Sequence, residues 1–246
     1  MAAPRQPVFN LPGAVSGLFT ALLALHLVRV LLPPRLDDQV ISRFGFIPAR
    51  VSAWLQPPLS PADSGGEGAV AVLVTFVTHM FIHADWFHVG LNALWLLPFG
   101  AAVARRLGSD VPGQLSFFAV FLVSGAAGAL AHLTFYPEVN LPLAGASGGV
   151  SGMMGAATRV MFSAGAFYSG RFVPLSPLSD SRVIIFAAVF VLINLVFGNY
   201  GVDFGVTQGA IAWQAHVGGF FAGLLLFPLF DRRLTLPPGP PRSPLS

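Results

Sequence analysis

The sequence predicts an all-α membrane protein with six transmembrane helices. Of its 246 residues, 54% are hydrophobic and only 9% are charged, whereas a soluble domain carries about 25% charged residues. The mean hydropathy of +0.73 excludes an intrinsically disordered chain, and the scarcity of charge excludes a coiled coil. In addition, six apolar stretches approach the roughly 20 residues that a helix needs to cross a bilayer.

The six stretches are residues 14–32, 86–103, 115–135, 147–162, 183–200 and 210–230. The first is long for the hydrophobic region of a signal peptide and lacks a small-x-small cleavage site, so we interpret it as a retained helix. Two prolines at positions 33 and 34 end it. The fourth stretch is the shortest and begins in glycine and serine.

A long first outer loop of about 50 residues joins the first two predicted spans. It contains prolines, charges and the Ser-Gly run at 64–66, and its segments 36–44 and 51–55 have helical or weakly amphipathic patterns. We therefore expect the loop to lie in the membrane interface. The predicted domain organisation is a cytoplasmic segment at 1–13, one membrane domain at 14–236 and a disordered Pro-rich tail at 237–246.

The arginines predict the orientation, because short cytoplasmic loops are enriched in basic residues. With both termini inside, the short outer loops around Glu138 and Asp203 carry no arginine, and Arg35, Arg43 and Arg50 all fall in the long outer loop. The segments then assigned to the cytoplasm hold Arg5, Arg105, Arg106, Arg159, Arg171, Arg182, Arg232, Arg233 and Arg242. We expect an N-in, C-in protein of a bacterial cell membrane.

Composition also excludes several functions. The chain has no cysteine, which removes disulfides, thiolate metal sites and cysteine nucleophiles. No basic stripe with interleaved aromatic residues occurs, so we expect no nucleic-acid partner. Any nucleophile must therefore be a hydroxyl, a carboxylate or a metal-bound water.

Polar side chains inside apolar spans are costly and mark candidate sites. They are His79, His83, His88 with Asn92, the serines Ser147 and Ser151, Asn194 and His216. His88 and Asn92 are four residues apart and share one helix face. Both are able to donate to one small anion, and the alternative is that they bond neighbouring helices.

The serine segment is rich in glycine, at positions 145, 148, 149, 152 and 155. Ser147 follows Pro142 closely, so we place it in the first turn of the fourth helix, where unpaired N–H groups stabilise an anion. The alternative is a packing face with two N-cap serines.

His216 is followed by Gly219 and Gly223, a G-x-x-x-G pattern that lets two helix backbones touch. If these glycines meet those of the fourth helix, the imidazole reaches Ser147 or Ser151. A serine beside a histidine supplies the nucleophile and the base of acyl transfer.

Three motifs follow one another along the chain, namely His88-Val-Gly-Leu-Asn92, Gly145-Ala-Ser147-Gly148 and Ala215-His216-Val-Gly-Gly219. In this order, and over roughly residues 70–230, they resemble the rhomboid family of intramembrane serine proteases. The resemblance implies a rhomboid-like six-helix fold with Ser147 as nucleophile and His216 as general base. It implies an oxyanion hole formed by His88, Asn92 and the Ser147 backbone N–H, with supporting roles for His83, Gly145, Gly148, Gly219 and Gly223.

The fourth and sixth predicted helices contain no Asp or Glu to orient His216. Ser151 stands where some rhomboid relatives have an aromatic residue against the base. We therefore expect a Ser-His dyad whose base is held in another way. His79 has no assigned role.

The implied activity is cleavage of transmembrane helices of other membrane proteins near the outer leaflet, without a metal or other cofactor. The expected partners are those substrates and the lipid bilayer, with access past the fifth helix and the loop after it. Three rival hypotheses are an inactive rhomboid-like protein that binds membrane helices, a metal-dependent hydrolase using His79, His83, His88 and His216, and a transporter.

Overall fold

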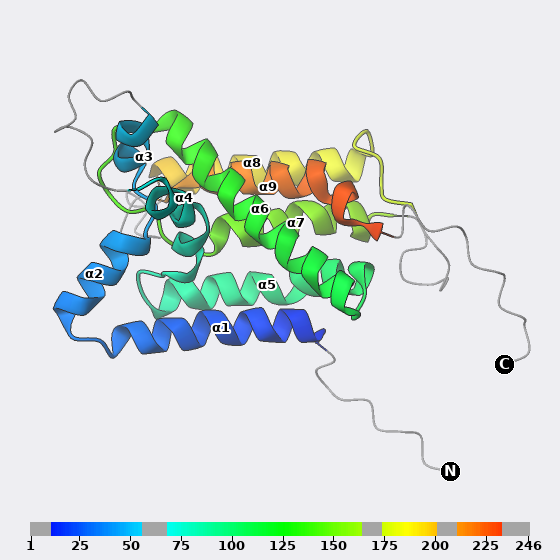
Figure 1. Ribbon diagram of the computed structural model, residues 1–246. Coiled ribbons are helices and arrows are strands. Elements are labelled where there is room, and N and C mark those ends of the chain that lie inside the picture. The colour runs from blue at the N-terminus through cyan, green and yellow to red at the C-terminus, as the bar shows by residue number, and fades with distance from the viewer. Residues whose placement is uncertain (1–10, 56–67, 164–173, 201–210, 233–246) are drawn as a thin grey trace, which may run out of the picture.

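The computed structural model describes residues 11–55, 68–163, 174–200 and 211–232. Within these ranges the chain is helical, and its only extended pairing is an isolated bridge between Phe46 and Leu143. The predicted all-α membrane fold is confirmed (Figure 1).

The helices follow one another in the order α1 Gly13–Val30, α2 Pro34–Phe44, α3 Pro48–Leu55, α4 Ala69–Thr78, the short 3₁₀ helix η1 His79–Phe81, α5 Trp86–Leu107, α6 Val111–Phe135, α7 Ser147–Met161, α8 Ser181–Tyr200 and α9 Trp213–Phe230. Within the described ranges, five of them are long and apolar enough to cross a membrane, namely α1, α5, α6, α8 and α9. Helix α7, with 15 residues, corresponds to the short fourth predicted span.

The predicted bounds differ most at α5 and α6. Helix α5 continues past the predicted residue 103 to Leu107, with Arg105 and Arg106 in its last turn, and Gly108 follows it at a φ of +99°. Helix α6 begins at Val111, earlier than the predicted residue 115, because the Asp110 side chain accepts a hydrogen bond from the Gly113 N–H and caps the first turn.

Helix α4 corrects the prediction that the whole segment between the first two spans is a loop with two short helices. Those two helices exist as α2 and α3, but the following residues form α4, a third and strongly apolar helix. Its 10 residues are too few to cross a bilayer, so a search for stretches of about 20 apolar residues passes over it. It packs against α2, α3 and α6 and ties the loop to the bundle.

Helices α6, α7 and α9 form the closely packed centre of the bundle, while α1 and α5 run side by side along one edge (Figure 1). The predicted glycine contact between the fourth and sixth spans is confirmed. A Cβ on Gly219 would overlap the backbone of Gly148, and a Cβ on Gly223 would overlap the backbone of Gly152. Larger residues cannot occupy this α7–α9 seam.

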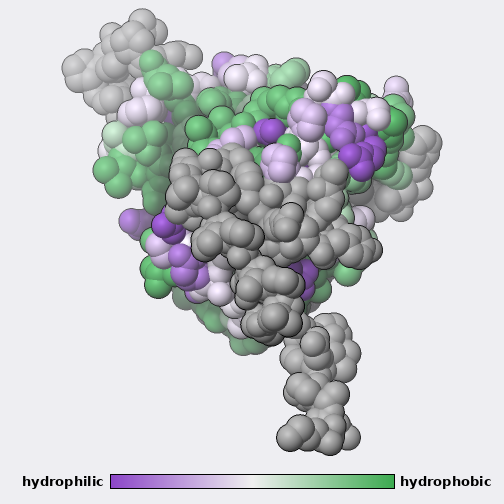
Figure 2. Space-filling view, turned by 90° about the vertical axis from the view of Figure 1, so that its right-hand side faces the viewer, coloured by the Kyte–Doolittle hydropathy of each residue, from purple (hydrophilic) through white to green (hydrophobic). Residues whose placement is uncertain are grey.

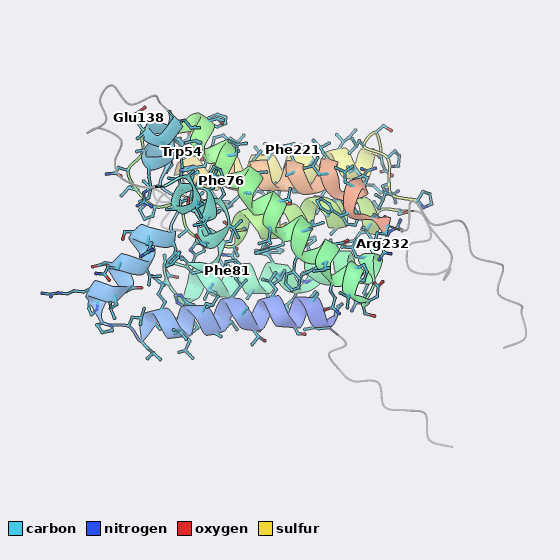
Figure 3. All side chains as sticks on the ribbon, in the orientation of Figure 1. Trp54, Phe76, Phe81, Glu138, Phe221 and Arg232 are labelled. Carbon is cyan, nitrogen blue, oxygen red and sulfur yellow. The ribbon has the colours of Figure 1, made fainter. Side chains whose placement is uncertain are left out.

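Two ion pairs lie at the end of the bundle where α5 and α9 end and α6 begins. Arg106 Nε of α5 donates to Asp231 Oδ2 after α9 over 2.8 Å, and Arg232 pairs with Asp110 at 3.4 Å. Figure 2 looks onto this end and shows hydrophilic side chains gathered around it. In Figure 3, Arg232 lies at this end, whereas Trp54 and Glu138 lie at the other. Helices α5, α7 and α9 all begin at the end of the bundle where Trp54 and Glu138 lie (Figure 1).

Several predicted features lie outside the described residues. They are most of the N-terminal segment, the run at 64–66, the loops that hold Arg171 and Asp203, the last four residues of the predicted membrane domain, and the tail at 237–246.

Candidate active site

Ser147 is the first residue of α7, as predicted. The Val150 N–H donates to the Ala146 carbonyl as the first backbone bond of the helix. Because an α-helix leaves its first N–H groups without intrahelical acceptors, the backbone around Ser147 presents donors to an anion. Ser147 itself is half-buried.

Gly145 shapes the turn that leads to Ser147. Its φ of +122° lies in a region that side chains disfavour. A Cβ at this position would lie 2.7 Å from Nε2 of His88 and 3.8 Å from Oγ of Ser147. The turn therefore requires glycine, and the His88 ring lies directly against it near the Ser147 hydroxyl.

His216 hydrogen-bonds to Ser147. From the first turn of α9, the imidazole Nε2 lies 2.8 Å from Oγ of Ser147. The glycine seam sets this approach, since Gly219 lies one turn beyond His216 and touches Gly148 next to the serine. A serine hydroxyl within hydrogen-bond reach of an imidazole is the arrangement that nucleophilic catalysis requires.

Asn194 of α8 completes a chain of three side chains. Its Oδ1 lies 2.7 Å from Nδ1 of His216. The sequence marks Asn194 as a polar residue in an apolar span, but only the packing of α8 beside α9 reveals its partner. The sequence predicts that His216 is held by a group other than a carboxylate. In the structure, the group bonded to its Nδ1 is the Asn194 amide.

His88 and Asn92 lie on one face of α5 as the spacing predicts. Asn92 is buried, and its Nδ2 donates to the His88 carbonyl over 3.0 Å. An amide nitrogen carries two N–H groups, so this bond leaves the second for another acceptor. His88 has its backbone N–H capped by Asp85 at 2.7 Å, which fixes the start of α5 beside the serine turn.

His83 supports the serine turn from the segment between η1 and α5. Its Nε2 accepts the Ala146 N–H over 3.2 Å. Burial, together with the nearby His88, His26 and Arg29, lowers the pKa of His83 to about 3, so the ring is neutral and able to accept. The Arg29 guanidinium, paired with Asp37 at 3.0 Å, donates to the His83 carbonyl.

His79 also supports this turn, a role that the sequence left open. The His79 carbonyl accepts the Gly145 N–H over 3.0 Å, and its ring Nδ1 bonds to the Thr75 carbonyl at 2.8 Å. Arg29 is a further residue that sequence reasoning missed, because its position near the end of a span suggests an ordinary interface anchor.

The second serine lies elsewhere. Ser151 is buried one turn deeper in α7, where backbone N–H groups bond to carbonyls four residues earlier. Of the four histidines of the metal-hydrolase hypothesis, His83 and His88 lie near each other, with ring centroids 5.2 Å apart. In the described ranges, no group of three or more His, Asp or Glu residues is placed to hold a metal ion.

The helices and the site together describe a multi-pass helical membrane protein with a serine–histidine pair at the start of a short central helix. The Rhomboid domain family model matches residues 71–233, more than half of the chain. The chain belongs to the rhomboid family.

Curated relatives agree with this family. The chain is 31% identical to "Rhomboid protease GluP" of Bacillus subtilis over 60% of this chain and 24% of that protein. It is 26% identical to "Rhomboid protein 1, mitochondrial" of Saccharomyces cerevisiae over 62% of this chain and 40% of that protein. It is also 26% identical to "RHOMBOID-like protein 1" of Arabidopsis thaliana over 76% and 43%. The aligned region spans less than half the length of each relative.

Proposed function

We propose that this rhomboid protein is an intramembrane serine protease that cleaves transmembrane helices of other membrane proteins near the outer leaflet. The observation that carries the proposal is the 2.8 Å contact between Oγ of Ser147 and Nε2 of His216. The name of the Bacillus subtilis relative, a protease, supports it.

In the proposed reaction, His216 takes the proton of the Ser147 hydroxyl as Oγ attacks the substrate carbonyl carbon. The negative charge that develops on the carbonyl oxygen faces the N–H groups at the start of α7, with His88 and Asn92 as further donors. Protonated His216 then gives its proton to the leaving amine. A water molecule releases the acyl group by the same steps in reverse.

Position favours Ser147 over Ser151 as the nucleophile. Ser147 is half-buried and has the His216 imidazole and the unpaired N–H groups of the first turn beside it. Ser151 is buried within α7. The site also lies at the end of the bundle away from Arg106 and Arg232, which agrees with an outer location in the proposed N-in, C-in orientation.

The test compares two serine variants in detergent. Ser147→Ala is expected to abolish both cleavage of a transmembrane substrate and labelling by a serine-hydrolase probe, while Ser151→Ala retains measurable activity. The reverse result would reject the assignment. A folded wild-type protein that binds membrane helices but neither cleaves nor labels would instead indicate an inactive helix-binding protein.

Metal dependence and pH dependence give two further measurements. Strong chelators are expected to leave cleavage unchanged, whereas inactivation reversed by Zn²⁺ would favour a metal hydrolase.

The pH–rate profile tests the role of the base. Because the base must be neutral and an unperturbed histidine has a pKa of about 6.5, the rate of cleavage is expected to fall under acidic conditions.

The orientation is tested by impermeant labelling of single cysteines introduced into this cysteine-free chain. A cysteine at Glu138 is expected to react in intact cells and one at Arg105 is not. Labelling at Arg105 alone would reverse the orientation.

A further inference from the structure

The amide of Asn194 has a defined orientation. Its Nδ2 lies 2.9 Å from the Phe190 carbonyl oxygen, and its Oδ1 lies 2.7 Å from Nδ1 of His216. Only the nitrogen of an amide is able to donate to a carbonyl. The bond to Phe190 therefore turns the amide oxygen toward the imidazole.

This orientation determines the tautomer of His216. An amide oxygen carries no hydrogen, so the bond to Nδ1 forms only if Nδ1 holds the ring proton. In the neutral ring, Nε2 is then the acceptor, and Nε2 is the atom 2.8 Å from the Ser147 hydroxyl. A single tautomer satisfies all of these contacts, and it is the one in which His216 is able to take the serine proton.

The helix that carries Asn194 is the least enclosed of the five long spans. Val183, near the opposite end of α8, is its only buried residue. Beyond that point α8 touches α9 through Phe186 and Phe190, whose rings stack on Phe220 with centroids 6.1 and 4.4 Å away. Asn194 lies one turn further along, so its bond to His216 forms only while this part of α8 lies against α9.

We propose that Asn194 is the positioning residue of the base: it holds His216 in its Nδ1-protonated tautomer and makes the Ser147–His216 pair competent only while α8 is docked on α9. This inference rests on the proposed protease activity. The side chain of Asn194 bonds to the Phe190 carbonyl and to His216, so it acts on Ser147 through His216. When the imidazole becomes protonated, the amide dipole stabilises the positive charge without a carboxylate.

The experiment compares Asn194→Ala, Asn194→Asp and the matched control Asn199→Ala. Asn199 is on the same helix and makes the same type of bond, from Nδ2 to the Leu195 carbonyl at 2.7 Å, but its side chain is exposed. Folding is monitored by thermal unfolding in detergent, and kcat, KM and the pH–rate profile are measured with one transmembrane substrate.

Asn194→Ala is expected to reduce kcat by on the order of 10- to 100-fold with KM unchanged, which is less than the about 10⁴-fold loss caused by a reversed tautomer in a serine triad. Asn194→Asp is expected to keep most of the activity and to move the acidic limb of the pH–rate profile to higher pH, because a carboxylate favours the protonated imidazole. His88 of α5, the other titratable group acting on His216, is unchanged in every variant. Asn199→Ala is expected to match the wild type.

An unchanged kcat in Asn194→Ala, or an unmoved pH profile in an active Asn194→Asp, would overturn the inference. If Asn194→Ala fails to fold, the profile of Asn194→Asp decides alone, and an Asp variant that folds but is inactive also contradicts the proposal. Failure of the protease proposal is seen separately, because the wild type would then not cleave the substrate, or Ser147→Ala would cleave it as fast as the wild type.

Discussion

Helix α9 meets α7 and α8 in two different ways. Against α7 it packs backbone to backbone, because glycines on both helices leave no space for a Cβ. Against α8 it packs through phenylalanine rings, and most of α8 remains exposed to the surroundings of the bundle. The α7–α9 seam brings Nε2 of His216 to Ser147, and the α8–α9 contact brings Asn194 to its Nδ1.

The difference separates two requirements of the proposed chemistry. The seam fixes the distance from His216 to Ser147 through atoms that cannot move apart without a gap or together without overlap. The α8–α9 contact contributes the orientation of the ring through one hydrogen bond from a loosely held helix. The α7–α9 seam therefore sets the position of the His216 ring, and the α8–α9 contact sets which ring nitrogen faces Ser147.

The largest effect among the following changes is expected at Asn92, a proposed oxyanion donor on α5, which is more enclosed than α8. Asn92→Ala is expected to slow cleavage by about 100- to 1,000-fold with folding intact, because one preorganised donor is lost. Turnover of a transmembrane substrate measures this. A loss smaller than that of Asn194→Ala would mean that the loosely packed side contributes more to catalysis, and an unchanged rate would remove Asn92 from the oxyanion hole.

Two glycine variants compare the two contacts directly. Gly223→Ala places a methyl group on the Gly152 backbone and is expected to destabilise the protein by about 1–3 kcal/mol or more, with loss of activity. In Gly198→Ala on α8, the three atoms nearest to the new Cβ all belong to Trp213, and the Trp213 Cβ is 2.6 Å away. Rotation of the indole ring does not move that Cβ, so the end of α8 has to shift away from the start of α9. Most of α8 is exposed, and alanine favours a helix over glycine by about 1 kcal/mol, so a smaller loss of stability than in Gly223→Ala is expected. Thermal unfolding of both variants checks this, and equal losses would show that the contacts are equally rigid.

The aromatic attachment of α8 is expected to be weaker. Phe190→Ala removes the ring stacked on Phe220 and is expected to cost about 0.5–1.5 kcal/mol for the ring pair, since lipid replaces part of the lost contact. If the α8–α9 contact positions Asn194, kcat falls together with this small loss of stability. Leu192→Ala, at a side chain that is 61% exposed, is the control and should leave both quantities unchanged. A normal kcat in Phe190→Ala would separate the docking of α8 from the function of the base.

The smallest expected effect is at the start of α8. Hydrogen bonds from Arg182 lower the pKa of Asp180 to about 2. Its stabilising contribution is therefore fully present above the ordinary carboxyl pKa of about 4 and is lost only as the pH falls toward 2. Asp180→Asn is expected to change the unfolding temperature slightly and equally at pH 7 and pH 5, because the pair is at the surface and Arg182 also bonds to the Phe162 carbonyl at 2.7 Å. A large or pH-dependent loss in that range would show that this end of α8 is held more firmly than its burial indicates.

The spans and the candidate residues follow from the amino-acid sequence without further information. Long apolar stretches predict membrane helices because the bilayer requires about 20 such residues, and glycine spacing predicts the seam because only a missing Cβ allows backbones to touch. The same physics explains the missed helix α4. Its 10 residues, of which Val72 and Thr75 are buried, are too few to cross the bilayer, so a criterion of about 20 apolar residues does not detect them.

Which of these residues meet depends on the packing of the helices in three dimensions. Asn194 and His216 are 22 residues apart on separate helices, and a sequence pattern within one helix carries no information on the rotation of another. Arg29 lies 54 residues from the His83 carbonyl that it contacts, and it reaches that carbonyl because α1 packs along α5. Helix periodicity specifies the face on which a side chain lies, but the partner of that face depends on how the helices pack together.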